Sequence, residues 1–374
     1  MSRAFFALVL VLLLSSSATG VSDRAAGRPA AAEQRQVDVT VPDLSPSTSR
    51  STGAATGGSR SWDGSGSVAS GSLPVGDPYV ALAEELHARG VRIWFDTDLV
   101  GSWLAGPTAF RTTVTRLGEL AKVPGFAGFK IADELGYEDG LESEAEAMRF
   151  LKDANAALDR VAPGAKVLVD AVVYELGCLD WSGDAAQEVC GNEARADYPA
   201  ASVSAITHYL HAGLIDVLDL STGLLEPADY QRWGMTRDDV QGAAWSHVRD
   251  LGWARFARLQ ARKALAEPGG YRESPEQTAA DVRTYVTLPL LGGAAAVELW
   301  TWRQPYDNSV VSLLPDDLAV TPLWATLERL HAEGAHFFTN MTPSAMPLDP
   351  VARAHECAVV AKVFSAVLVA AGTG

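Results

Sequence analysis

The chain has 374 residues, of which 48% are hydrophobic, so it is long enough for one large barrel domain or two modest domains. Its formal net charge is −16 and its pI is about 4.8. An acidic surface of this kind repels phosphate, which argues against nucleic acid and anionic membrane as partners and favours a neutral or cationic substrate. The alternative is that the acidity only keeps the protein soluble and has no role in selecting a substrate.

The first twenty residues predict a secretory signal peptide. Arg3 gives a positive start, Ala4 to Leu14 is an unbroken apolar run, and Ala18 to Gly20 fits a small-x-small cleavage site. The apolar run is short for a bilayer span. We therefore expect a secreted, extracellular protein that has no membrane association once residues 1–20 have been cleaved.

Residues 21–76 are predicted to be a flexible leader followed by a Ser/Gly-rich low-complexity segment. Within the leader, residues 36–41 (QVDVTV) alternate apolar and polar side chains, which predicts a short strand. Residues 45–72 have Trp62 and Val68 as their only large apolar side chains, so this segment is either a linker or a long loop.

From residue 77 onward, the pattern predicts helices and strands in alternation. Strands are predicted over 91–98, 126–134, 166–175, 214–223, 259–266 and 294–302. Helices are predicted over 78–90, 108–122, 143–161, 195–212, 238–256, 274–291, 322–333 and 351–371. Several strands are almost continuously apolar, as parallel strands buried on both faces should be.

Six strand–helix alternations predict an α/β fold with a parallel sheet. If residues 36–41 and a segment near Val68 add two strands, the fold is a (β/α)8 TIM-type barrel whose first two units are irregular. The barrel domain then covers residues 77–374. The alternative is an open doubly wound sheet. Because GxGxxG and GxxxxGKS/T are both absent, nucleotide binding has no support, the barrel is favoured, and we expect no cofactor.

Acidic and aromatic residues gather where the predicted strands end, which in a barrel is the edge that carries the active site. Glycoside hydrolysis needs this combination, because it uses one protonated carboxyl group, a second carboxylate, and aromatic faces that stack on sugar rings. The candidates for catalysis or substrate binding are Asp96, Asp98, Asp133, Glu134, Tyr137, Tyr174, Glu267, Trp300, Trp302 and Gln304.

Two short segments resemble TIM-barrel glycoside hydrolases. GFKIADELGY, in which Asp133 and Glu134 close a strand, resembles their acid/base strand, and ELWTWRQ resembles the strand that carries their sugar-platform tryptophan. The resemblance implies Glu134 as the proton donor and Glu267 as the counterpart of the nucleophile. Asp133 is a departure, because Asn usually precedes the acid. The Asp-Glu pair also resembles the hexosaminidase-type arrangement, in which Asp133 would orient a substrate acetamido group.

We therefore expect an enzyme that cleaves a glycosidic bond in a carbohydrate by carboxylate acid/base catalysis. The alternatives are a barrel that binds carbohydrate without cleaving it, and a hydrolase or lyase of another substrate class. Trp300 and Trp302 share a parity on their strand, so we expect one in the core and the other as a platform. Glu298 is either catalytic or paired with Arg262 or Lys263.

Three cysteines are present. Cys178 and Cys190 lie in a loop-like segment at a spacing that suits a disulfide in an exported protein, which leaves Cys357 as a buried apolar residue. His208 and His211 are three residues apart on a predicted helix, but no carboxylate or cysteine completes a ligand set, so no metal site is expected.

Overall fold

The computed structural model describes residues 77–370 apart from 98, 138, 180–182, 226, 232–233, 257 and 307–308. The predicted signal peptide, the leader with its strand at 36–41, the segment near Val68 and the candidate Asp98 lie outside these residues. Along the described part of the chain, no helix combines the length and apolar character that a membrane span requires.

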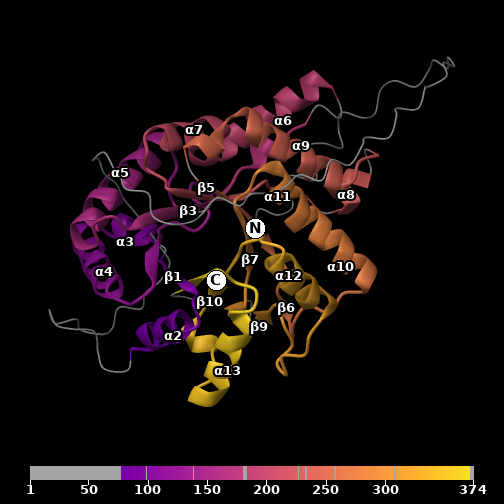
Figure 1. The fold of residues 1–374 in the computed structure, drawn as a ribbon. Coiled ribbons are helices and arrows are strands. Elements are labelled where there is room, and N and C mark those ends of the chain that lie inside the picture. Colours follow the sequence, from indigo (N-terminus) through magenta and orange to yellow (C-terminus); the bar gives the residue numbers. More distant parts are fainter. Residues whose placement is uncertain are drawn as a thin grey trace. The chain divides into compact units, whose positions relative to one another are not determined.

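Eight parallel strands within the described residues make up the central sheet (Figure 1). Each pairs with the next in the series β1, β2, β3, β4, β5, β7, β10, β11, and β11 also pairs with β1. The sheet is therefore curled, with a concave and a convex face. The strands are β1 (Arg92–Asp96), β2 (Phe126–Lys130), β3 (Lys166–Val172), β4 (Val217–Ser221), β5 (Arg258–Ala264), β7 (Ala296–Trp300), β10 (Phe337–Met341) and β11 (Ala366–Ala370).

A small antiparallel extension joins one edge of this sheet. β8 (Arg303–Tyr306) and β9 (Ser309–Ser312) form a hairpin, and β9 also pairs with the short β6 (Glu267–Pro268). β8 meets β10 through the pairing of Arg303 with Met341. The extension therefore lies at the carboxyl ends of β5, β7 and β10.

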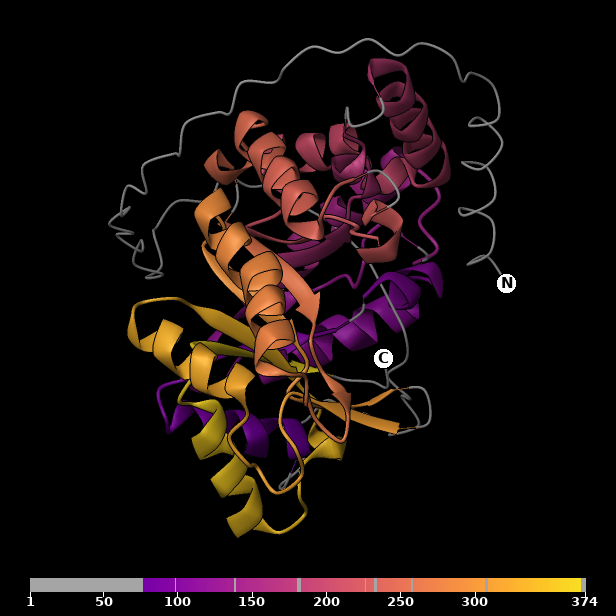
Figure 2. The same ribbon diagram turned by 90° about the vertical axis from the view of Figure 1, so that its right-hand side faces the viewer.

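Helices follow the strands along the chain and surround them, as the two views in Figures 1 and 2 show. Side chains cap the first turn of several of these helices, such as α9, where Thr236 and Asp239 form a capping box. The helices are α2 (Pro78–His87), α3 (Val100–Leu104), α4 (Pro107–Leu120), α5 (Glu144–Val161), α6 (Asp184–Asp197), α7 (Val203–His211), α8 (Pro227–Gln231), α9 (Arg237–Asp250), α10 (Pro275–Val282), α11 (Leu288–Gly292), α12 (Pro322–Ala332) and α13 (Pro350–Val360).

The alternation of side chains along the strands separates two hydrophobic cores. In β1, Ile93 and Phe95 belong to the large core between the sheet and the helices, whereas Trp94 belongs to a smaller core on the concave face. This concave core comprises Trp94, Leu168, Val217, Ala296, Phe338, Ala366 and Leu368.

The six predicted strands are all present, and the predicted α/β class is confirmed. The predicted helix over 351–371 is wrong in its second half: α13 ends at Val360, and Ala366–Ala370 is β11. A run of apolar residues fits a buried parallel strand as well as a helix, and pairing with β1 and β10 decides in favour of the strand. The predicted helix over 195–212 is divided at Pro199 into α6 and α7.

β10 lies at residues for which no element was predicted. Together with β11 it brings the parallel strands in the described residues to eight, without a contribution from residues 36–41 or from the segment near Val68. α2 precedes β1 and packs against both β1 and β11. It therefore covers the place where the first and last strands of the series meet.

Candidate active site

A layer of buried polar side chains lies on the concave face, one step nearer the carboxyl ends of the strands than the concave core. Asp96 ends β1, Lys130 ends β2, and Asp170, Asp219 and Glu298 lie within β3, β4 and β7. Lys130 is 2% exposed, and the last three are completely buried. Buried charges are tolerated only when they are paired, so this layer needs an internal balance.

Lys130 supplies the positive charge of this layer. Its Nζ lies 2.7 Å from Asp133 Oδ1, 3.2 Å from Asp170 Oδ2 and 3.5 Å from Asp96 Oδ2. Burial alone would lower the pKa of Lys130, but the surrounding carboxylates hold it well above its ordinary value. The carboxylates around Lys130 therefore favour its ammonium form over the neutral amine that Schiff-base chemistry needs.

Asp96 lies at the boundary between this layer and the carboxyl edge of the sheet. Asn340 of β10 donates a hydrogen bond from Nδ2 to Asp96 Oδ2 at 2.7 Å. Burial raises the pKa of Asp96 to about 6, against the opposing effect of Lys130 and with a further increase from Asp133. Its carboxyl group therefore changes its charge close to neutral pH.

Asp219 and Glu298 form a second acidic pair in the layer. Burial raises the pKa of Asp219 well above its ordinary value, and the charge of Glu298 and a hydrogen bond to it raise it further. Among the described residues, neither carboxyl group has an N–H or O–H partner. Burial at this position therefore favours the neutral form of Asp219.

Glu134 follows β2 on a short, tightly held loop. Its backbone is left-handed, with φ of 57°, and its carbonyl accepts a hydrogen bond from Tyr137 N at 2.7 Å. Leu135 N donates to Asp170 O at 2.8 Å, which ties the loop to β3. At Gly136, φ is 74° and a Cβ would lie 2.6 Å from Ala200 Cβ, so only glycine fits there. The half-buried Glu134 is therefore fixed at the carboxyl edge of the sheet.

Three half-buried tyrosines lie beside this loop. The ring of Tyr137 is 5.6 Å from that of Tyr174 and 4.8 Å from that of Tyr198, and Tyr174 and Tyr198 are stacked at 5.4 Å. The Tyr174 hydroxyl donates to the Tyr137 hydroxyl at 3.5 Å. Tyr198 was not among the sequence candidates, because it comes from the junction after α6 rather than from a strand end.

Glu267 and Trp300 lie at the same carboxyl edge. Glu267 begins β6, just after β5, and pairs with Ser312 of β9. Burial raises its pKa, and the negative charges of Glu273 and Asp281 raise it further. Trp300 ends β7, is half-buried, and meets the exposed Tyr306 edge to face, with ring centres 5.2 Å apart.

Trp302 and Gln304, which were candidates for substrate binding, are both buried. Trp302 is 1% exposed, packs against Trp324, and donates from Nε1 to Glu356 Oε2 at 2.9 Å. It is the core member of the Trp300 and Trp302 pair. Gln304 is 6% exposed, and within the described residues its Oε1 has no hydrogen-bond partner.

The sequence candidates therefore divide into three groups. Asp96 and Asp133 meet at Lys130, Glu134 and the tyrosines adjoin them along β2 and β3, and Glu267 with Trp300 follows β5 and β7. Lys130 was missed, because a lysine at a strand end resembles a solvent-facing one. In the described residues, no group of three or more acidic, histidine or cysteine side chains is arranged to hold a metal ion.

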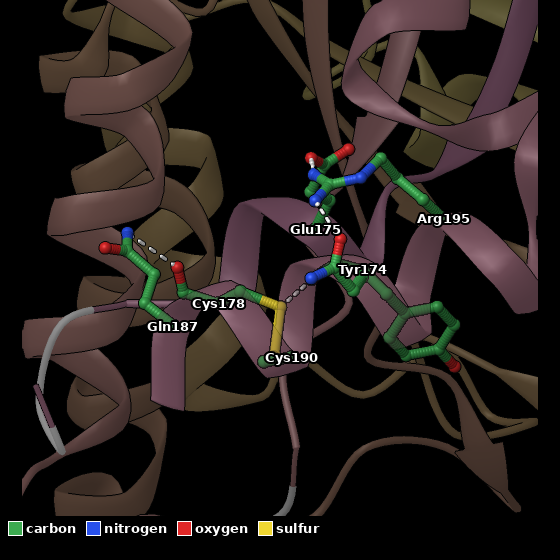
Figure 3. The surroundings of a disulfide bond; sticks show 7 residues. Tyr174, Glu175, Cys178, Gln187, Cys190 and Arg195 are labelled. Carbon is green, nitrogen blue, oxygen red and sulfur yellow. Dashed lines mark hydrogen bonds and ion pairs between the residues drawn. A yellow bond between two sulfur atoms is a disulfide. The ribbon is translucent and has the colours of Figure 1, made fainter. Parts of the chain in front are cut away.

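Cys178 and Cys190 form the predicted disulfide, with an S–S distance of 2.05 Å (Figure 3). Cys357 is free and buried, as predicted. Gln187 donates from Nε2 to the Cys178 carbonyl at 3.0 Å, and Arg195 pairs with Glu175 beside the bridge. The disulfide therefore fastens α6 to the turn that follows β3.

No family model matches the chain, and no curated protein matches its sequence. Similar solved structures include an intracellular xylanase from Thermoanaerobacterium saccharolyticum, with 12% identity over 76% of this chain and 87% of the other and a TM-score of 0.43. A thermostable mutant of a xylanase from Cellvibrio japonicus has 12% identity over 76% and 88%, with a TM-score of 0.40. A probable tagatose 6-phosphate kinase from Sinorhizobium meliloti has 17% identity over 79% and 62%, with a TM-score of 0.39. TIM-barrel glycoside hydrolases are thus among its structural neighbours, but so is a kinase, and this level of similarity carries no argument about activity.

Proposed function

We propose that this chain is a glycoside hydrolase-like enzyme built on a closed (β/α)8 barrel. The closed barrel is supported by the pairing of β11 with both β10 and β1. The observation that carries the activity is the fixed, half-buried Glu134 beside the Lys130–Asp133 ion pair, at the carboxyl edge of the parallel strands. Active sites of such barrels are built at this edge.

In this proposal Glu134 protonates the glycosidic oxygen and Glu267 is the second carboxylate, which either attacks the sugar or activates water. Asp133 and Asp96 accept hydrogen bonds from sugar hydroxyl groups, and their shared contact with Lys130 keeps both in place. Trp300 and the three tyrosines supply the aromatic faces on which sugar rings stack.

We also propose that the chain is exported through residues 1–20. The Cys178–Cys190 disulfide supports export, because disulfides persist in oxidising compartments. The substrate then meets the enzyme outside the cytosol.

The proposed activity is tested with aryl glycosides that share one sugar and differ in the acidity of the leaving phenol. A leaving group such as 2,4-dinitrophenol needs no proton, whereas 4-methoxyphenol does. Glu134→Gln should therefore lose about 10²- to 10⁴-fold in kcat on the methoxyphenyl glycoside and much less on the dinitrophenyl one. Glu267→Gln should lose activity on both substrates.

Glu142→Gln is the matched control, because Glu142 is an exposed glutamate that follows the same loop. It should retain the activity of the unmodified chain. Equal losses on the two leaving groups would remove Glu134 from the acid role. Binding of sugars by calorimetry without turnover of any aryl glycoside would replace the enzyme by a carbohydrate-binding barrel.

A further inference from the structure

The three half-buried tyrosines beside the candidate acid come from separate parts of the chain. Tyr137 lies on the loop after β2, and Tyr174 begins the turn η3 (Tyr174–Gly177), which follows β3. Tyr198 lies between α6 and the turn η5 (Pro199–Ala201). Each presents part of its ring to solvent, because none of the three is fully buried. The contacts of η3, α6 and η5 show how the rings are held together.

η5 packs directly on the loop that carries the candidate acid. A Cβ at Gly136 would lie 2.6 Å from Ala200 Cβ, so the loop and η5 are in close contact. Tyr209 of α7 donates a hydrogen bond from its hydroxyl to Ala200 O at 3.0 Å, which fixes η5 from behind. The position of Tyr198, the residue before η5, is therefore set relative to Glu134.

Glu175 links the elements that carry two of these tyrosines. It follows Tyr174 directly, and its carboxylate pairs with Arg195, which lies three residues before Tyr198. The second carboxylate oxygen accepts a hydrogen bond from Val203 N at 2.8 Å. One side chain thus connects η3 to the end of α6 and to the start of α7, and it supports the stacking of Tyr174 on Tyr198.

The disulfide makes the same connection covalently (Figure 3). Cys178 follows η3, and Cys190 lies within α6. η3, α6 and η5 are therefore fastened together, and we call them the braced segment. Such fixation suits a binding surface, because side chains that are already held in place lose little conformational entropy when a ligand binds.

The tyrosines and Trp300 lie on opposite sides of the mouth of the proposed barrel. From β2 to β7 the strand series takes four steps in either direction, through β3, β4 and β5 or through β1, β11 and β10. Eight strands that are about 4.8 Å apart and tilted by about 36° form a ring about 15 Å across. A sugar ring is much smaller than this, so one that contacts Trp300 does not also reach the tyrosines.

The acid determines which part of a substrate meets the tyrosines. In the proposed reaction Glu134 gives its proton to the glycosidic oxygen, which departs with the leaving group. The leaving group therefore lies on the Glu134 side of the cleaved bond. Tyr137 shares the loop of Glu134, and Tyr174 follows the neighbouring strand, whereas Trp300 is across the mouth. A leaving group that rests on the tyrosines needs an apolar face and polar groups at its edge, which a sugar ring has.

We propose that the braced segment forms a subsite for a sugar on the leaving-group side, and that the substrate is an oligosaccharide or polysaccharide cleaved between sugar units. This rests on the proposed function and specifies its substrate class. The leaving sugar stacks on Tyr198, and its hydroxyl groups bind those of Tyr137 and Tyr174, which are 3.5 Å apart. The disulfide positions this subsite and takes no part in the reaction.

The test compares leaving groups on one sugar. Cello-, xylo-, manno- and malto-oligosaccharides, from disaccharide to hexasaccharide, are screened for cleavage. The glycosyl fluoride of the sugar released is the reference substrate, because fluoride has no face that can stack on a tyrosine. We expect Tyr198→Ala to lower kcat/KM on the oligosaccharide at least tenfold more than on the fluoride, since binding of a remote sugar contributes to kcat/KM. Tyr198→Phe keeps the ring and should keep most of the preference for the oligosaccharide.

Tyr79→Ala is the matched control, because Tyr79 is a half-buried tyrosine of α2 that packs against the large core. It should leave the ratio of the two kcat/KM values unchanged. Tyr198→Leu keeps an apolar side chain and loses the flat ring, so it replaces Tyr198→Ala if that variant does not fold. Cys190→Ser releases α6 and should shift the ratio in the same direction as Tyr198→Ala. A loss of folded protein lowers both values equally and cancels in the ratio.

An equal fall of kcat/KM on both substrates, or no fall on either, in the Tyr198 variants that lack a ring would overturn the proposal and leave the proposed function in place. So would hydrolysis of aryl glycosides without cleavage of any of the oligosaccharides. Absence of turnover on aryl glycosides, fluorides and oligosaccharides alike would overturn the proposed function as well.

Discussion

Replacing Lys130 by Met tests whether the buried polar layer holds together through one cation. The variant removes the ammonium that lies within 4 Å of Asp96, Asp133 and Asp170 and keeps a side chain of similar length. Removing one partner from a buried ion pair leaves the other charge without compensation and costs about 3–5 kcal/mol. We expect a loss of this size in the free energy of unfolding at pH 7.

The loss should shrink as the pH falls. Asp96 has a pKa of about 6 with Lys130 in place, and Lys130 lowers that pKa, so the variant raises it further above the ordinary value of 3.8. Between these pH values the folded variant binds more protons than its unfolded chain, so its stability increases as the solution is acidified from pH 7 to pH 5. Protonation of Asp96 removes the negative charge that the ammonium group of Lys130 had balanced.

Urea unfolding followed by tryptophan fluorescence at pH 7 and pH 5 measures both effects. Lys122→Met is the control, because the side chain of Lys122 is 67% exposed and its pair with Glu119 should be worth about 0–1 kcal/mol. A Lys130→Met variant no less stable than Lys122→Met would refute the reasoning. So would a loss that grows on acidification.

Three further predictions concern the loop, the pH profile and the disulfide. Gly136→Ala should displace the loop that carries Glu134. The expected result is a lower kcat in steady-state assays, with little change in the fluorescence of tryptophans far from the loop. Glu273→Gln removes a charge that raises the pKa of Glu267, so the acidic limb of the pH profile of kcat/KM should move to lower pH. If the limb does not move, Glu267 is not the group whose ionisation produces it. Cys178→Ser opens a loop of 12 residues and should lower stability by about 3 kcal/mol in urea titrations.

The strands could be predicted where periodicity and composition agree. β1 to β4 and β7 are runs of mainly apolar residues between turn signals, and they were placed from the sequence, as was the more polar β5. β10 was not, because Thr339 and Asn340 interrupt its apolar run. Their donor groups are engaged in tertiary contacts: Thr339 donates to Leu299 O, and Asn340 donates to Asp96. No local pattern contains that information.

The candidate site was predictable in part for the same reason. Asp96, Asp133 and Glu134 follow directly from the rule that functional residues of parallel sheets lie past the carboxyl ends of strands. Lys130 and Asp219 depend on which face of each strand is concave, and alternation fixes the parity of a strand without saying which parity points inward. Which of Trp300 and Trp302 lies in the core could not be read from the sequence, because the partner of Trp302, Glu356, comes from a helix more than fifty positions away.

The pairing of β11 with β1 has a consequence for biosynthesis. β1 emerges from the ribosome early and must wait for nearly the whole chain before its second neighbour exists. Until then β1 and β10 each keep an exposed backbone edge, which is a template for pairing with other chains. A nascent or prematurely terminated chain that lacks the last ten residues is therefore the form of this protein most prone to aggregate.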